Sequence, residues 1–150
     1  MAKQTGTLSE AFNDAFYLFS HILFLSNIYK ELMSTNIGGL ESVEFAELVL
    51  EAAQWRMECG SGHEATPLID QVEAIYNKLE ISANPRQYGQ LYRARVLLAR
   101  DYGHGQDCLR YAKLEIEQEQ VRADREGGLT GELAISNNNM AMAYAYCGNY

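Results

Sequence analysis

The chain has 150 residues, the size of one ordinary domain, and 47% of them are hydrophobic, a share typical of globular proteins. Its formal charge of −8 at pH 7 argues against nucleic acids and anionic membranes as partners, because both require a basic surface. An odd number of widely spaced cysteines argues against a disulfide scaffold and favours reduced thiols in a cytoplasmic protein.

The first residues do not resemble a signal peptide, and the longest apolar-rich run, 15–25, is too short to span a bilayer. A first helix is predicted over 8–33, where Thr7 and Glu10 have the spacing of a capping box. Apolar residues nearly encircle its middle turns, which is typical of a helix buried on more than one side. It is expected either to lie between two other helices or to pack against a second copy or a neighbouring domain.

Two helical hairpins are predicted next, over 41–82 and 85–126. In the first hairpin, the opening helix covers about 41–58, and Thr66-Pro67 predicts an N-cap followed by proline at the first position of the next helix. Asn84-Pro85 repeats that start signal for the second hairpin, whose first helix is expected to end at Gly103. Its second helix is predicted over about 106–126, and the charged stretch 115–126 is expected to face water.

The last predicted helix covers 131–147 and begins after Thr130, and Gly148 is expected to end it in a left-handed C-cap. No segment alternates between apolar and polar residues over the length of a strand. The sequence therefore predicts a single all-α domain, 1–150, with about six helices.

Three glycines that follow predicted helices give the chain an internal period. Gly60, Gly103 and Gly148 are 43 and 45 residues apart, which is in the range of helical-hairpin arrays. In such an array each hairpin buries its apolar face against its neighbours, which makes an α-solenoid. The last helix is then the first half of an incomplete unit. A different pairing, first helix with second and third with fourth, remains open.

The last helix resembles the first helix of a tetratricopeptide repeat, through the pattern Asn139-Met140-Ala141-x-x-Tyr144-x-x-x-Gly148-Asn149-Tyr150. Within that family the chain is similar to the longer-period repeats of kinesin light chains and signalling ATPases. The upstream units match less well, since Arg95 stands in place of a leucine and Ala99 and Arg56 in place of aromatic residues.

The resemblance implies a peptide-binding groove lined by the first helix of each unit, with an asparagine at position 139 that grips a peptide backbone. An asparagine amide offers both a donor and an acceptor for that purpose. The alternative is that 137–139 satisfy neighbouring helix ends or water. Capture of a C-terminal carboxylate is not expected, because Leu91 and Arg95 stand where its basic and amide residues would be. The predicted groove residues are Leu50, Gln54, Gln90, Arg93, Leu97, Asn138, Asn139 and Met142.

The candidate chemistry outside the groove is weak. Two turns carry cysteine and histidine, the ligands that zinc prefers, but the spacing inside a glycine-rich turn is not diagnostic. No phosphate-binding loop or nucleophile elbow is present. The sequence predicts no catalytic residues, no cofactor and no metal, with a remote zinc alternative at Cys59, His63, His104 and Cys108.

The sequence therefore favours a non-catalytic scaffold of tetratricopeptide type, part of a larger array, that binds a protein or peptide in the cytoplasm. One alternative is a module that self-associates through the apolar first helix and the incomplete last repeat, because exposed apolar faces often mark interfaces. A second alternative is a regulatory sensor of a small ligand or peptide.

Overall fold

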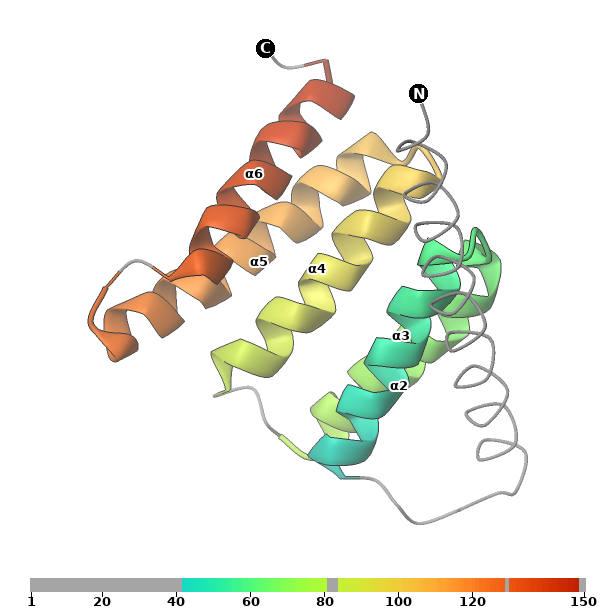
Figure 1. Cartoon of the computed structure of the whole chain (residues 1–150), viewed down its shortest axis with the longest axis horizontal. Coiled ribbons are helices and arrows are strands. Elements are labelled where there is room, and N and C mark those ends of the chain that lie inside the picture. Colours follow the sequence, from blue (N-terminus) through green and yellow to red (C-terminus); the bar gives the residue numbers. More distant parts are fainter. Residues whose placement is uncertain (1–41, 81–83, 129, 149–150) are drawn as a thin grey trace, which may run out of the picture. The chain divides into compact units, whose positions relative to one another are not determined.

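The computed structural model describes residues 42–80, 84–128 and 130–148, all of which belong to one compact unit, Leu40–Tyr150. These residues are helical and contain no strand, so the all-α prediction is confirmed for this part of the chain. The predicted helix over 8–33 lies outside the described residues. The helices are α2 (Val43–Glu58), α3 (Gly62–Lys78), α4 (Pro85–Asp101), α5 (Gly105–Glu126) and α6 (Gly131–Tyr146) (Figure 1).

Side-chain caps and proline set three of the helix starts. The hydroxyl of Ser42 accepts a hydrogen bond from the backbone N–H of Phe45 at 3.2 Å, and Thr130 does the same for Leu133 at 3.1 Å. Each bond satisfies one of the N–H groups that a helix start leaves without a partner. Pro85 occupies the first turn of α4 after Asn84. The predicted starts of α4 and α6 are thus confirmed.

The predicted start of α3 at Pro67 is wrong. The helix begins at Gly62, and Pro67 lies inside it. The tight turn after α2 explains the early start, because the backbone N–H of Ser61 bonds to the carbonyl of Arg56 at 2.8 Å and brings the chain directly into a new helix. Since proline has no N–H, the helix forms through Pro67 without one of its ladder hydrogen bonds.

The turns after α2 and α4 share one geometry. Gly60 and Gly103 have φ values of +75° and +71°, where a glycine has no Cβ to clash. In each turn the next residue donates its N–H back across the helix end, as His104 does to the carbonyl of Ala99 at 2.8 Å. This is the Schellman arrangement. Gly148, after α6, has a φ of +68°, so the expected left-handed C-cap is confirmed.

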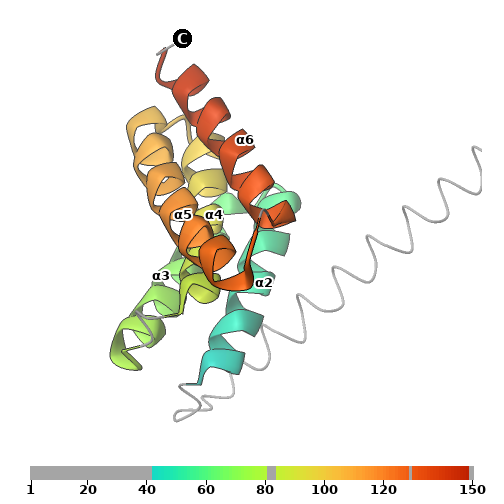
Figure 2. The same cartoon turned by 90° about the vertical axis from the view of Figure 1, so that its left-hand side faces the viewer.

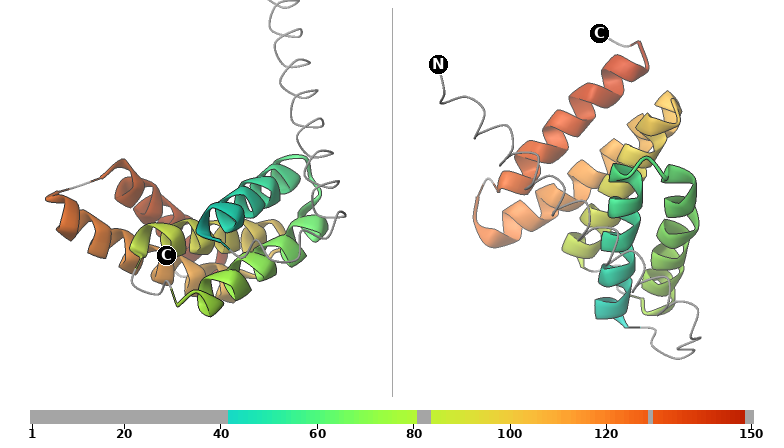
Figure 3. Two further views of the ribbon diagram at one scale, coloured as in Figure 1. Left: turned by 90° about the horizontal axis from the view of Figure 1, so that it is seen from below. Right: turned by 45° about the vertical axis from the view of Figure 1, so that its right-hand side comes forward.

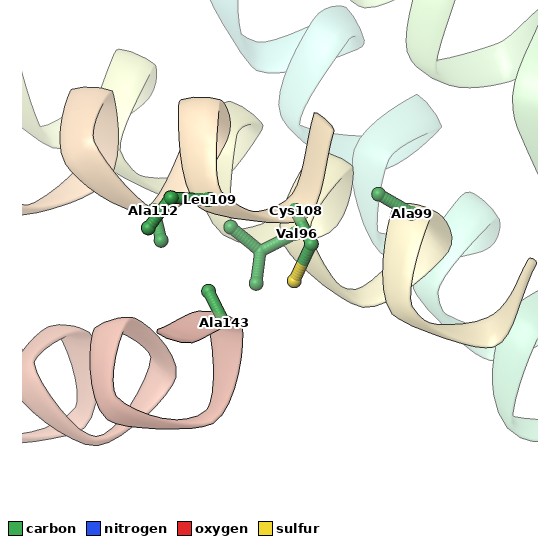
Figure 4. Close-up of a cluster of buried hydrophobic side chains, with 6 residues drawn as sticks. All are labelled: Val96, Ala99, Cys108, Leu109, Ala112 and Ala143. Atoms are coloured by element: carbon green, nitrogen blue, oxygen red, sulfur yellow. The ribbon is translucent and has the colours of Figure 1, made fainter. Parts of the chain in front are cut away.

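The helices pack mainly on their neighbours in the sequence: α2 on α3, α4 on α5, and α5 on α6. Helices that are not adjacent in the sequence also meet, because α4 contacts both α2 and α6. Figure 1 accordingly shows α4 between the α2–α3 pair and α6, and Figure 3 shows the α2–α3 pair from two further sides. A buried apolar cluster joins α4, α5 and α6 (Figure 4); it contains Val96, Ala99, Cys108, Leu109, Ala112 and Ala143.

A row of tyrosines connects α3, α4 and α5. The ring centroids of Tyr76 and Tyr88 are 5.7 Å apart, as are those of Tyr88 and Tyr92, and Tyr92 stacks on Tyr111 at 6.4 Å. Aromatic pairs at such distances add to the stability that burial of their area supplies. Burial raises the pKa of Tyr76 to about 12, with Glu47 and Tyr88 adding to the shift. These tyrosines pack α3, α4 and α5 against one another.

Candidate functional site

A hollow of about 250 Å³ lies between the first helices α2 and α4. Three of the predicted groove residues line it: Leu50 and Gln54 from α2, and Gln90 from α4. The remaining lining residues were not predicted; they are Glu47, Glu51 and Arg86. The spacing that could have revealed them is helical, because 47, 51 and 54 share one face of α2, and 86 and 90 share one face of α4.

The residues that line the hollow are mostly polar, and one of them, Glu47, is hydrogen-bonded to a buried side chain. Glu47 accepts a hydrogen bond at 2.8 Å from the side-chain Nε2 of Gln87, a residue that is only 7% exposed. The carbonyl oxygen Oε1 of Gln87 is buried without a hydrogen-bond partner. Two carboxylates and several amide oxygens therefore gather on this side of α2 and α4, opposed by the guanidinium of Arg86.

Leu97, Asn138 and Met142, three further groove candidates, do not line this hollow, and they differ in accessibility. Leu97 of α4 and Met142 of α6 are half-buried, and Asn138 of α6 is exposed. Helical spacing places Gln90 and Leu97 on the same stripe of α4, and Asn138 and Met142 on one stripe of α6. These residues therefore remain candidates for contact with a ligand.

Arg93 is committed to partners inside the protein. Its Nε donates to Oε1 of Glu115 on α5 at 2.9 Å, and its NH1 group pairs with Glu132 on α6. Its NH2 nitrogen is buried with no hydrogen-bond partner. Arg93 was a predicted groove residue, but Glu115 and Glu132 already neutralise its charge. The residue instead links α4 to both later helices.

Asn139 is also directed inward. It is 4% exposed, and its Nδ2 donates to both carboxylate oxygens of Glu115, at 3.2 and 3.0 Å. Ser136 donates its hydroxyl to Oε1 of the same carboxylate at 2.9 Å. Asn139 therefore satisfies a buried carboxylate in the middle of α5, which is neither the expected contact with a peptide nor the alternative of satisfying a helix end or water.

The expectation that 115–126 faces water is wrong for three residues, Glu115, Glu119 and Ala123, which are buried. Glu115 is 0% exposed and Glu119 is 1% exposed. Together with Ala112 and Ala123 they form the buried line of α5, at spacings of three and four residues. The spacing was readable in the sequence, but the charges hid it, because Glu is almost never fully buried unless it is paired.

Glu119 has a different environment from Glu115. Burial raises its pKa, and the nearby Arg122, at 3.4 Å, and Arg93 oppose that shift. Its carboxylate also touches α4 closely, since a Cβ at Gly89 would lie 2.5 Å from Oε1. Gly89 therefore leaves the space that the Glu119 side chain fills.

The zinc alternative finds no support in the geometry. Cys59, His63 and His104 are exposed, whereas Cys108 is 1% exposed inside the apolar cluster. Burial raises the pKa of the Cys108 thiol, which disfavours the thiolate that a metal needs. No group of three or more potential metal ligands occurs among the described residues.

No protein-family model, no curated protein and no solved structure matches the chain. Within 42–148, the described residues form no helix that is both long enough and apolar enough to cross a lipid bilayer.

Proposed function

We propose that the chain is a non-catalytic binding module of tetratricopeptide type, whose first helices α2, α4 and α6 accept an extended peptide. The pairing of α2 with α3 and of α4 with α5, each through a left-handed glycine turn, supports a hairpin repeat. The contacts of α4 with both α2 and α6 support a shared surface made by first helices. The resemblance of α6 to the first helix of a tetratricopeptide repeat also supports this proposal.

The observation that carries the proposal is the hollow between α2 and α4. It coincides with three residues that the repeat pattern assigned to the groove: Leu50, Gln54 and Gln90. A groove of this kind combines an apolar floor with polar groups that fix the orientation of a ligand. Leu50 is 3% exposed and supplies the floor, and the two glutamines supply amide donors and acceptors at the wall.

The charges of the hollow select the peptide. Glu47 and Glu51 outnumber Arg86, and the whole chain is acidic, with a formal charge of −8. A peptide that carries a lysine or arginine is therefore attracted, and an acidic peptide is repelled. Arg93 and Asn139 have internal partners, so we assign ligand binding to Glu51, Gln54 and Gln90 instead.

The test uses a phage-displayed library of short unstructured peptides, followed by titration of the selected peptides by fluorescence anisotropy. We expect enrichment of peptides with a basic residue. Glu51→Lys reverses a charge in the hollow and is expected to weaken binding by about tenfold or more, that is by at least about 1.4 kcal/mol.

Glu58→Lys is the matched control, because Glu58 is exposed on the same helix outside the hollow. It is expected to bind the selected peptides nearly as tightly as the wild type. The proposal fails if no peptide binds in solution, or if Glu51→Lys binds as tightly as Glu58→Lys.

A further inference from the structure

Two of the three cysteines share the apolar cluster that joins α4, α5 and α6. Cys108 is a member of the cluster, at 1% exposure, and Cys147 packs against it from the end of α6. Both are free thiols. Cys59, the third cysteine, is exposed at the end of α2 and lies outside the cluster. The fold thus brings together two thiols that are far apart in the sequence.

The sulfur of Cys147 lies against the start of α5. The two helices pack antiparallel, so the end of α6 is beside the start of α5 (Figures 1 and 2). The thiol of Cys147 donates a hydrogen bond to the carbonyl oxygen of Gly105, the first residue of α5, at 2.9 Å. A Cβ at Gly105 would lie 3.4 Å from the same sulfur. Cys147 is therefore in direct contact with the first turn of α5.

The side chain of Cys108 lies over that same turn. Cys108 comes three residues after Gly105, and a helical side chain leans toward the N-terminus, over the turn before it. Figure 4 shows its sulfur on the side of α5 that faces Ala143 of α6. Ala143 belongs to the same cluster and is one helical turn before Cys147. Both sulfurs therefore lie where the first turn of α5 meets the end of α6.

The ionisation of Cys108 is consistent with this placement. Burial is the main cause of the raised pKa of the Cys108 thiol, and Cys147 adds to the shift. A second ionisable thiol has this effect when it is close enough for its negative charge to be felt.

We propose that Cys108 and Cys147 form a reversible disulfide bond that ties the end of α6 to the first turn of α5. A disulfide requires Cα atoms about 4–7 Å apart, a spacing that residues on directly contacting turns reach. The bond closes a loop that contains most of α5 and all of α6. It is independent of the peptide groove, because neither cysteine lines the α2–α4 hollow.

The bond forms by exchange with a small disulfide, such as oxidised glutathione. The thiolate of Cys147, the more exposed of the two, attacks one sulfur of the oxidant and displaces a glutathione thiolate, which leaves a mixed disulfide. The thiolate of Cys108 then attacks the Cys147 sulfur and displaces the second glutathione thiolate. The two protons lost by the cysteines go to the two released thiolates. Two protein thiols are thus oxidised, and one small disulfide is reduced to two thiols.

Replacing the cysteines one at a time gives a matched series, because each variant keeps two of the three thiols. Cys59→Ser keeps the proposed pair, whereas Cys108→Ser and Cys147→Ser each leave one member with Cys59. The folded chains are equilibrated with reduced and oxidised glutathione, the remaining thiols are blocked with N-ethylmaleimide, and peptide mapping by mass spectrometry locates the bonds. We expect a Cys108–Cys147 disulfide in the wild type and in Cys59→Ser, and only mixed disulfides in the other two variants.

The same equilibration in urea separates a bond placed by the fold from one that any flexible chain makes. The ratio of disulfide to dithiol in Cys59→Ser is expected to be at least about tenfold higher in native buffer, because the fold raises the effective concentration of one thiol at the other. The bond in turn stabilises the fold. The midpoint of thermal unfolding of oxidised Cys59→Ser is expected to lie about 5 °C or more above that of the reduced protein, and Cys147→Ser is expected to show no such gain.

Two results overturn the proposal. One is a folded Cys59→Ser chain that keeps both thiols or carries only mixed disulfides. The other is a disulfide yield in Cys59→Ser that is the same in urea as in native buffer. Both results rest on a variant whose replaced residue is exposed, and circular dichroism checks that it is folded. Neither result affects the peptide titrations, since Glu51 lies on α2.

Discussion

Asn139 on α6 donates its side-chain amide to both carboxylate oxygens of Glu115 on α5, at distances of 3.2 and 3.0 Å. With Arg93 and Ser136 as further donors, the Glu115 carboxylate is fully surrounded by protein, at 0% exposure. A buried carboxylate is tolerated only when its charge and its lone pairs are satisfied. The pair therefore makes the docking of α6 depend on its polar residues as much as on its apolar ones.

Removing the Glu115 carboxylate is expected to destabilise the protein strongly. Glu115→Ala leaves Arg93 half-buried with one carboxylate fewer and leaves the amide of Asn139 without an acceptor. Loss of one partner of a buried ion pair typically costs about 3–5 kcal/mol. Urea unfolding measures the change in the free energy of unfolding. Glu117→Ala, at an exposed position of the same helix, is expected to cost less than about 0.5 kcal/mol. Equal losses for the two variants would contradict this assignment.

Asn139→Asp is expected to place a second carboxylate against Glu115. Like charges at this distance cannot both ionise, so the pKa of one carboxyl group is raised in the folded state. Stability is then lost as the pH rises through that raised pKa, and is recovered as the pH falls below it. We expect a loss on the order of 3 kcal/mol at pH 7 and a smaller loss near pH 4.

Asn138→Asp provides the comparison for that change, because Asn138 is the exposed neighbour. Its stability is expected to be nearly that of the wild type across the same pH range. Urea unfolding at several pH values distinguishes the two variants. A loss for Asn139→Asp that does not depend on pH would count against close contact with Glu115.

Glu119 is expected to make stability depend on pH with a defined sign. Burial raises its pKa in the folded protein above the ordinary value of 4.5. The folded state therefore holds this proton more tightly than the unfolded state. The free energy of unfolding falls as the pH rises from about 4.5 through the raised pKa, and is constant above it.

Glu119→Gln removes this titration. The difference in unfolding free energy between wild type and variant is expected to shift in favour of the variant as the pH rises through that window. A difference that is the same at pH 4 and pH 7 would show that Glu119 has an ordinary pKa. Urea unfolding in matched buffers supplies the measurement.

Pro67→Ala is expected to stabilise the protein. Pro67 is exposed and lies inside α3, where its ring displaces a backbone hydrogen bond, and a helix-interior proline costs about 3 kcal/mol relative to alanine. Part of this gain is offset, because proline also restricts the unfolded chain by about 1 kcal/mol or less. We expect a net gain of about 1–2 kcal/mol in thermal or urea unfolding.

Pro85→Ala is the contrasting change. Pro85 is buried in the first turn of α4, where its missing N–H costs nothing, so its replacement is expected to give no gain. If both replacements stabilise the protein equally, or if neither does, the position of Pro67 within α3 does not have the expected effect.

Helix starts and ends that depend on local chemistry were predictable from the sequence. Thr130 and Gly103 act through bonds to residues within a few positions, and Pro85 acts through its fixed φ angle, so their effect can be read without the fold. Pro67 misled the prediction because the α2–α3 turn, closed by Ser61 and Arg56, starts the helix before the proline is reached.

The candidate site was only partly predictable, for a physical reason. Leu50, Gln54 and Gln90 were found because helical periodicity places them on one surface. The inward direction of Asn139 depends on a carboxylate 24 positions away, and the helical spacing of Glu115 and Glu119 indicates a buried line only once their charges are known to be paired. When charged residues occupy the helical positions that face the core, the sequence alone predicts that they are exposed to solvent. Only the distant residues that pair with them show that they are buried.

The preference of each helix for its neighbour in the sequence also governs how the chain reaches its structure. Since most contacts in 42–148 join adjacent helices, each loop to be closed is short, and such topologies fold rapidly. We therefore expect the described helices to unfold pair by pair when the chain is pulled from its ends. The contact between Arg93 and Glu132 spans 39 positions and bridges α4 to α6, so resistance to such unfolding is concentrated around it.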